Sequence, residues 1–125
     1  MTDGRRPTDA EALEATPTDL TLGDVLGAAA DEAGGVTATA DGAATTFAAG
    51  SPPALFAALS GDRAEFRLDP LVARAALRAP GTSGSPRGPD WVAFAPGILD
   101  DGAVDRAEAW FLSAHRRATA AGGSH

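Results

Sequence analysis

The chain of 125 residues contains no cysteine, no lysine and no tyrosine. The absence of cysteine excludes disulfides, thiolate catalysis and cysteine-ligated metal sites. All ten basic residues are arginine, so neither a lysine Schiff base nor the lysine of a phosphate-binding P-loop is available. No apolar run approaches the length of about 18 residues that a membrane helix needs, and residues 1–19 lack the apolar stretch of a signal peptide. We therefore expect a cytoplasmic protein that has no membrane partner.

The residues that are present have the composition of a globular protein, with 44% hydrophobic and 22% charged residues. The net charge of −7 is uneven: residues 1–32 hold two arginines and eight acidic residues, whereas residues 33–99 hold five of each. A chain of this length forms one domain. We expect a disordered acidic tail over residues 1–17, a single domain over residues 18–121 and a flexible C-terminus over residues 122–125.

Three segments have the start signals and apolar periodicity of helices; they are 21–35, 69–80 and 100–120. The first begins with Thr21 three residues before Asp24, which is typical of a capping box. The second begins with Asp69 and then a proline at the first helical position. In the second helix we expect Leu71, Ala75 and Leu77 on the buried side. The buried stripe of the last helix is expected to contain Val104, Ala107, Trp110, Phe111, Ala114 and Ala118.

Strand signals fill most of the remaining chain. Residues 35–50 predict a hairpin that turns at Asp41–Gly42, and residues 51–70 predict a second hairpin that turns at residues 60–62. Residues 81–90 are expected to form a loop before a short strand, WVAFA, at residues 91–95. The expected fold class is α+β with two layers, in which three helices and a mostly antiparallel sheet follow the order α-β4-α-β-α.

Ten apolar residues from these elements are expected to form the core. They are Phe47, Leu55, Phe56, Leu59, Phe66, Leu68, Val92, Phe94, Val104 and Phe111.

The chain contains a series of short motifs whose spacing is known from small bacterial proteins. The motifs are Leu55–Phe56–Ala57, Leu59, Arg67–Leu68–Asp69, Arg87–Gly88, Trp91–Val92 and Ala114–His115–Arg116. Over about residues 20–118, the chain resembles the YjbR-like (MmcQ/YjbR) family in these motifs. The resemblance implies a two-layer fold similar to secretion chaperones and to the N-terminal domain of TfoX-type regulators. It also implies a DNA-binding-like role.

Arg87 and Trp91 are the first candidate binding residues. Pro86 and Pro89 restrict the backbone around Arg87, and a rigid arginine is suited to hold a phosphate or a carboxylate. Trp91 is suited to stack on a base or to pack under Arg87. The alternative is structural, with the stiff loop setting where the last strand begins and Trp91 anchoring that strand.

Arg74 and Arg78 are the second pair of candidate binding residues, because their spacing places them on one helix face. Together with Arg87 they would form a small basic patch; the alternative is a solvated helix face. His115, which follows Phe111 by four residues, is expected at the border of the buried stripe rather than in a catalytic pair with Glu108.

The acidic run Asp100, Asp101 and Asp105 is expected to cap the last helix rather than to hold a metal ion. No cofactor is expected.

These features favour a non-enzymatic binding module that has a protein partner or weakly associates with itself. The alternative is a DNA-binding-like regulator that uses Arg74, Arg78 and Arg87. The charge disfavours this alternative, because nucleic-acid binding depends on neutralising phosphates and the chain is acidic overall.

Overall fold

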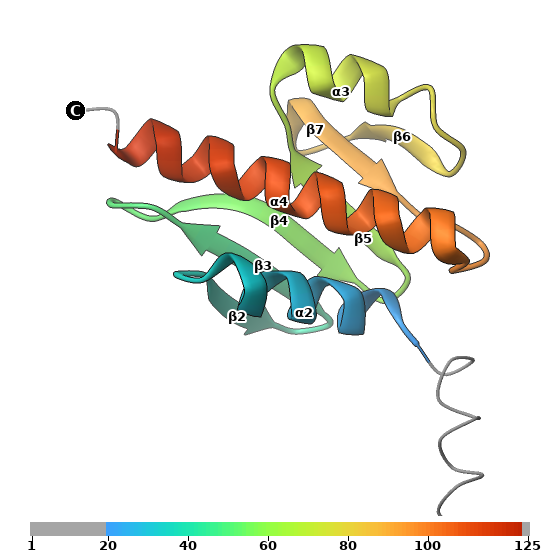
Figure 1. The fold of residues 1–125 in the computed structure, drawn as a ribbon, viewed down its shortest axis with the longest axis horizontal. Helices are drawn as coiled ribbons and strands as arrows, with labels where there is room; N and C mark the ends of the chain where they lie inside the picture. The colour runs from blue at the N-terminus through green and yellow to red at the C-terminus, as the bar shows by residue number, and fades with distance from the viewer. Residues whose placement is uncertain (1–19, 124–125) are drawn as a thin grey trace, which may run out of the picture.

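The computed structural model describes residues 20–123, which form three helices and one six-stranded antiparallel sheet (Figure 1). The α+β class and the order of helices and strand blocks that the sequence predicts are confirmed. The helices are α2 (Leu22–Ala33), α3 (Pro70–Ala76) and α4 (Asp101–Gly123). The strands are β2 (Thr37–Asp41), β3 (Ala44–Ala49), β4 (Ala54–Ser60), β5 (Arg63–Arg67), β6 (Thr82–Ser85) and β7 (Gly88–Phe94). The expected tail over residues 1–17 lies outside the described residues.

The strands lie in the order β2-β3-β4-β5-β7-β6. Two-residue turns join β2 to β3 and β4 to β5, and each begins with a glycine at positive φ, Gly42 at 64° and Gly61 at 58°. The first turn is centred on Gly42–Ala43, because Asp41 pairs with Ala44. This is one residue later than the sequence predicts, since Asp41 belongs to the strand and glycine alone supplies the positive φ.

The segment 81–90, which the sequence predicts as a loop, contains β6 and the start of β7. β6 pairs with β7 through Ser83 and Ala93, and the sheet therefore has six strands where the sequence indicates five. The hydroxyl of Thr82 donates to the carbonyls of Ala76 and Ala79, which fixes β6 to the end of α3. β6 consists of Thr, Ser and Gly, so it has no apolar alternation that could reveal a strand.

The start signals of the helices act as the sequence predicts. Thr21 and Asp24 form a complete capping box at α2, and the side chain of Asp69 accepts from the backbone N–H of Leu71 at α3. Asp100 caps α4, because its carboxylate accepts from the N–H of Ala103 at 2.8 Å. α4 continues through Gly122 and Gly123, beyond the end that these glycines predict.

The core lies between the sheet and two of the helices, with α4 crossing the sheet and α2 alongside it (Figure 1). Phe111 of α4 packs edge-on against Phe47 and Phe56 at centroid distances of 5.2 and 5.1 Å. Trp110 packs against Phe94 in the same way at 5.0 Å. The aromatic side chains of α4 and the sheet therefore hold the two layers together.

Seven of the ten expected core residues are buried: Phe47, Phe56, Phe66, Leu68, Val92, Phe94 and Phe111. Leu55, Leu59 and Val104 are half-buried. Leu59 and Val104 still pack against the core cluster at its border. A register shift in the pairing of β3 and β4 lies next to Leu55, where strand alternation no longer predicts which side chains are buried.

The prediction of which side of α3 is buried is wrong. Leu71 and Leu77 are 70% and 47% exposed and Ala75 is exposed, whereas Ala73 and Ala76 are buried. α3 has only seven residues, and its small alanines allow it to lie close to the sheet beside β7. The sequence pattern assigned the leucines of this segment to the core, whereas the side of α3 that packs there carries Ala73 and Ala76, with Val72 at its border.

One face of the sheet is covered by α4, as shown by Phe66, which contacts Trp110. Since neighbours along a strand point to opposite faces, Glu65 lies on the other face. Glu65 pairs with Ala58 of β4 and Ala93 of β7 and so stands at the middle of this second face. Among residues 20–123, no helix is long and apolar enough to cross a membrane.

Candidate functional site

Arg87 lies on the turn between β6 and β7, beside Trp91 of β7. The guanidinium carbon of Arg87 is 5.4 Å from the centroid of the Trp91 ring, which is within range of a cation–π contact. Trp91 is buried in β7 and pairs with Arg67 of β5. Arg87 therefore covers the Trp91 ring, and that ring is not open to stacking by a nucleic-acid base.

Arg87 is also bound to Glu65, which is the one charged residue that is buried in the described part of the chain. Its Nε donates to Glu65 Oε1 at 2.9 Å, and the Ser85 hydroxyl donates to the second carboxylate oxygen. Arg63 adds a longer ion pair to Glu65 at 3.6 Å. These contacts engage the charge of Arg87 within the protein, although a third of its side chain remains exposed.

The surroundings of Glu65 keep it ionised. Burial by itself raises the pKa of Glu65, but the hydrogen bonds from Ser85 and Arg87 and the charges of Arg87 and Arg63 outweigh this effect. The pKa therefore lies below its ordinary value. We call Arg63, Glu65, Ser85, Arg87 and Trp91 the Glu65 cluster.

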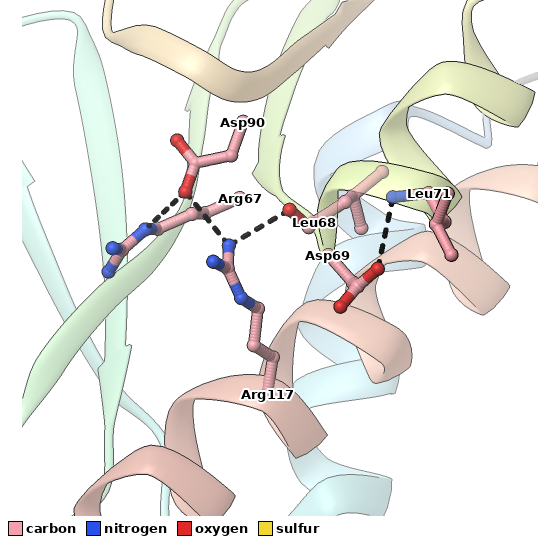
Figure 2. Close-up of polar contacts among 6 residues, drawn as sticks. All are labelled: Arg67, Leu68, Asp69, Leu71, Asp90 and Arg117. Carbon is pink, nitrogen blue, oxygen red and sulfur yellow. Dashed lines mark hydrogen bonds and ion pairs between the residues drawn. The ribbon is translucent and has the colours of Figure 1, made fainter.

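A second cluster joins β5, β7 and α4 around Asp90 (Figure 2). Arg67 Nε donates to Asp90 Oδ2 at 3.1 Å, and Arg117 Nη1 donates to the same oxygen at 2.9 Å. Arg117 Nη1 also donates to the backbone carbonyl of Leu68 at 2.9 Å. We call Arg67, Asp90 and Arg117 the Asp90 cluster.

Asp90 is ionised for the same reason as Glu65. Burial raises its pKa, the hydrogen bonds from Arg117 and Arg67 lower it, and the pKa lies below its ordinary value. The cluster thus contains two guanidinium groups and one carboxylate, all charged at neutral pH.

A small hollow of about 90 Å³ borders the Asp90 cluster. Arg67 and Arg117 form its polar side, while Leu55, Phe56 and Ala114 contribute to its apolar side. Sequence reasoning missed these two arginines as a pair. They are 50 positions apart in the sequence, on a strand and a helix, so no local motif connects them.

Arg74 lies on α3 and Arg78 in the turn that follows it; both are exposed and make no ion pair with the described residues. Arg74 lines an open groove of about 460 Å³ with Leu77, Pro89 and Asp90. Arg87, on the turn between β6 and β7, is bound to Glu65. A single patch of these three arginines therefore stays a prediction.

His115 has a structural contact. Its Nε2 lies 3.1 Å from the carbonyl oxygen of Gly34, and its ring packs edge-on against Phe56 at 5.6 Å. It therefore links the end of α2 to α4 at the border of the core. Among the described residues, no group of three His, Asp or Glu side chains is arranged to hold a metal ion.

The free edges of the sheet differ strongly. All five residues of β2 are exposed, and β2 pairs with β3 in an unbroken register from Thr37 to Asp41. At the opposite edge, β6 has four residues, contains a register shift at Gly84–Ser85 and is tied to α3 by Thr82. β2 is thus the longer and more regular of the two edges.

Comparisons with protein-family models, with curated proteins and with solved structures found no match to this chain. The resemblance to the YjbR-like family therefore stays a prediction, and the case for function depends on the geometry of the chain itself.

Proposed function

We propose that this chain is a protein-interaction module that accepts an extended strand of its partner at the free edge of β2. The observation that carries the proposal is the exposure of all five residues from Thr37 to Asp41, in a strand that the described residues pair on one side only. Addition of a strand to an exposed edge is a recurrent form of protein recognition, in which main-chain hydrogen bonds supply the affinity.

β2 lacks the features by which proteins usually block an exposed edge. Such edges are protected by lysine, proline, bulges or inward-pointing charges. The sequence of β2 is TATAD, its register is regular, and its single charge, Asp41, lies at the end next to the turn. An edge with small side chains and unbroken pairing supports a role in binding another strand.

The hairpin geometry indicates which backbone groups are available. Asp41 and Ala44 flank a two-residue turn, where the flanking residues of a hairpin exchange hydrogen bonds. Bonded and non-bonded pairs alternate along an antiparallel ladder. The N–H and C=O groups of Ala38 and Ala40 therefore point away from β3, toward the free side.

A second copy of this chain matches this arrangement. If two β2 strands pair antiparallel about Thr39, Ala38 of one copy lies opposite Ala40 of the other, and the two pairs form about four hydrogen bonds. Asp41 then lies opposite Thr37, so no like charges face each other across the ladder. The contact is isologous, as in most homodimers, and it is weak because its side chains are small.

Analytical ultracentrifugation over a range of protein concentrations tests this self-association. Two chains of net charge −7 repel each other, so we expect the dimer fraction to rise as salt increases from about 50 to about 500 mM. The variant Ala40→Pro removes an outward N–H but no bond to β3, and it should abolish the dimer while the fold is retained. Ala40→Val keeps the N–H and is the matched control, which should dimerise at least as well.

A chain that stays monomeric at about millimolar concentration in high salt would overturn the proposal, since dissociation constants above this range indicate no useful contact. A dimer that Ala40→Pro does not weaken would also overturn it, because the contact would then lie elsewhere.

A further inference from the structure

The hollow beside the Asp90 cluster contains unused hydrogen-bond donors. A guanidinium group has five N–H donors. Arg67 uses its Nε for Asp90, and Arg117 uses Nη1 for both Asp90 and the Leu68 carbonyl. The terminal nitrogens of Arg67 are turned away from Asp90 in Figure 2, and within residues 20–123 they have no other acceptor.

These donors are also held in place. Arg117 is fixed by two acceptors, the Leu68 carbonyl just after β5 and the Asp90 carboxylate on β7, and Asp90 bridges it to Arg67. Side chains that are ordered before a ligand arrives lose less conformational entropy when it binds. The positions of both guanidinium groups at the hollow are therefore determined by the fold rather than by a ligand.

Charge and size together define what the hollow accepts. Two guanidinium groups face one carboxylate, so the Asp90 cluster has an excess positive charge beside the half-buried side chains of Ala54 and Leu55. The hollow has a volume of about 90 Å³, which leaves room for a small molecule only. An anion that fits is small, and the apolar wall favours one with a short alkyl group.

We propose that Arg67 and Arg117 form a binding site for a carboxylate that bears a short alkyl group. The carboxylate accepts hydrogen bonds from the free nitrogens of the two arginines. With the ligand bound, two guanidinium groups face two carboxylates, so the charge of the cluster is balanced. The alkyl group lies against Ala54 and Leu55, which are the half-buried apolar residues that line the hollow. This site is separate from the β2 edge and does not depend on the proposed function.

The Glu65 cluster has the same charges but does not offer such a site. Its carboxylate already accepts from Ser85 as well as Arg87, and Arg87 lies on the Trp91 ring. Neither Arg63 nor Arg87 lines any of the four main pockets of residues 20–123. The presence of a cavity thus distinguishes the Asp90 cluster from the other arginine pair.

The test is an NMR titration of the isotopically labelled chain with sodium propionate at constant ionic strength. We expect saturable shifts of the Arg67 and Arg117 side-chain N–H signals and of the Leu55 amide, with millimolar affinity. Propionamide, which has the same shape without the charge, should cause no such shifts. Arg67→Gln and Arg117→Gln should each weaken binding at least about tenfold, because each removes a charged donor.

Arg116→Gln is the matched control, because it removes the same charge from the neighbouring exposed position of α4. If this variant weakens binding as much as Arg117→Gln, the effect is one of general charge and the proposal is wrong. If Arg117→Gln disturbs the fold, Arg67→Gln still tests the site, because Arg67 bonds to Asp90 alone and is nearly half exposed. An absence of saturation up to about 100 mM propionate would overturn the site.

Two further ligands identify the source of the carboxylate. Inorganic phosphate should bind more weakly than propionate, because it gains nothing from the apolar wall; stronger binding of phosphate would contradict the proposal. A short peptide with a free C-terminus and the same peptide with an amidated C-terminus then separate a protein terminus from a small organic acid. Tighter binding of the free peptide than of propionate supports the first source, and equal binding supports the second.

Discussion

Glu65 is the residue around which the charged contacts on the second face of the sheet are arranged. It is buried to 7% exposure between two alanines, Ala58 and Ala93, and a charge there would be costly without partners. Ser85 and Arg87 supply hydrogen bonds and charge, so the carboxylate stays ionised although it is buried. If one partner is removed, the other charge stays in a poorly solvated site without a counter-charge. Such pairs are therefore sensitive to mutation.

The acid stability of the protein should depend on Glu65 and Asp90. Both have folded-state pKa values below their ordinary values of 4.5 and 3.8, so at acidic pH the folded chain binds fewer protons than the unfolded chain. The stabilisation is therefore complete above about pH 5 and is lost as the pH falls through the lowered pKa values. Urea unfolding at several pH values measures this, and Glu65→Gln should make the loss shallower. Identical pH dependence in the two proteins would contradict the role of Glu65.

Phe111 is the residue on which the contact between α4 and the sheet depends most. It is fully buried and packs edge-on against Phe47 and Phe56. We expect Phe111→Ala to lower the free energy of unfolding by about 3–5 kcal/mol, because it leaves a cavity between the layers. Chemical denaturation measures the change. A loss below about 1 kcal/mol would mean that α4 is not docked through this side chain.

At the scale of elements, α3 and β6 form one unit at the edge of the sheet. Thr82 ties β6 to the last turn of α3, and the N–H of Ala95 bonds to the carbonyl of Gly81 at 2.8 Å. Gly81 has a φ of 81°, and a Cβ there would lie 3.3 Å from the backbone of Ala95. The connection between α3 and β6 is therefore compact, and a residue other than glycine would be strained at this position.

Because one side of α3 is buried and the other exposed, substitutions on the two sides should differ strongly in their effect on the free energy of unfolding. Leu71→Ser should change the free energy of unfolding by less than about 0.5 kcal/mol, because Leu71 is mostly exposed. Ala76→Asp should cost more than about 2 kcal/mol, because it places a charge without a partner at a buried position. Thermal or chemical unfolding of the two variants tests the orientation, and the reverse ranking would show that the other face of α3 is buried.

At the scale of the whole molecule, charge governs which partners can approach. The chain has a net charge of −7, and the arginines of the Glu65 and Asp90 clusters are bonded to carboxylates within the protein. DNA binding depends on cations that neutralise the phosphates, and the carboxylates of these clusters already offset part of the charge of their arginines. The molecule is therefore better suited to uncharged backbone contacts or to a small carboxylate than to a nucleic-acid backbone.

We accordingly expect no specific binding to duplex DNA. Non-specific binding at physiological salt should have a dissociation constant of about 10⁻⁴ M or weaker. A mobility-shift titration with duplex and single-stranded DNA, at low and at physiological salt, measures it. Micromolar binding at about 150 mM salt that Arg87→Ala abolishes would restore the alternative of a DNA-binding regulator.

The sequence by itself determined the elements whose signals are local. The helix starts are marked by Thr21 with Asp24 and by Asp69 with Pro70, and the turn of the second hairpin is marked by Gly61. Each signal acts within a few residues, so the pattern located these helix starts and this turn. The stripe of α4 was also visible, because a long helix repeats its apolar face over several turns. The α+β class follows from the order of these elements.

The tertiary structure alone decided the features that join distant segments. Arg87 meets Glu65 across 22 positions and Arg117 meets Asp90 across 27, and no spacing in the sequence distinguishes these partners from other arginines and acids. The buried side of α3 and the pairing of β6 likewise depend on what lies beside them once the chain is folded. Local signals specify backbone conformation, whereas burial and ion pairing depend on neighbours that only the folded topology brings within contact distance.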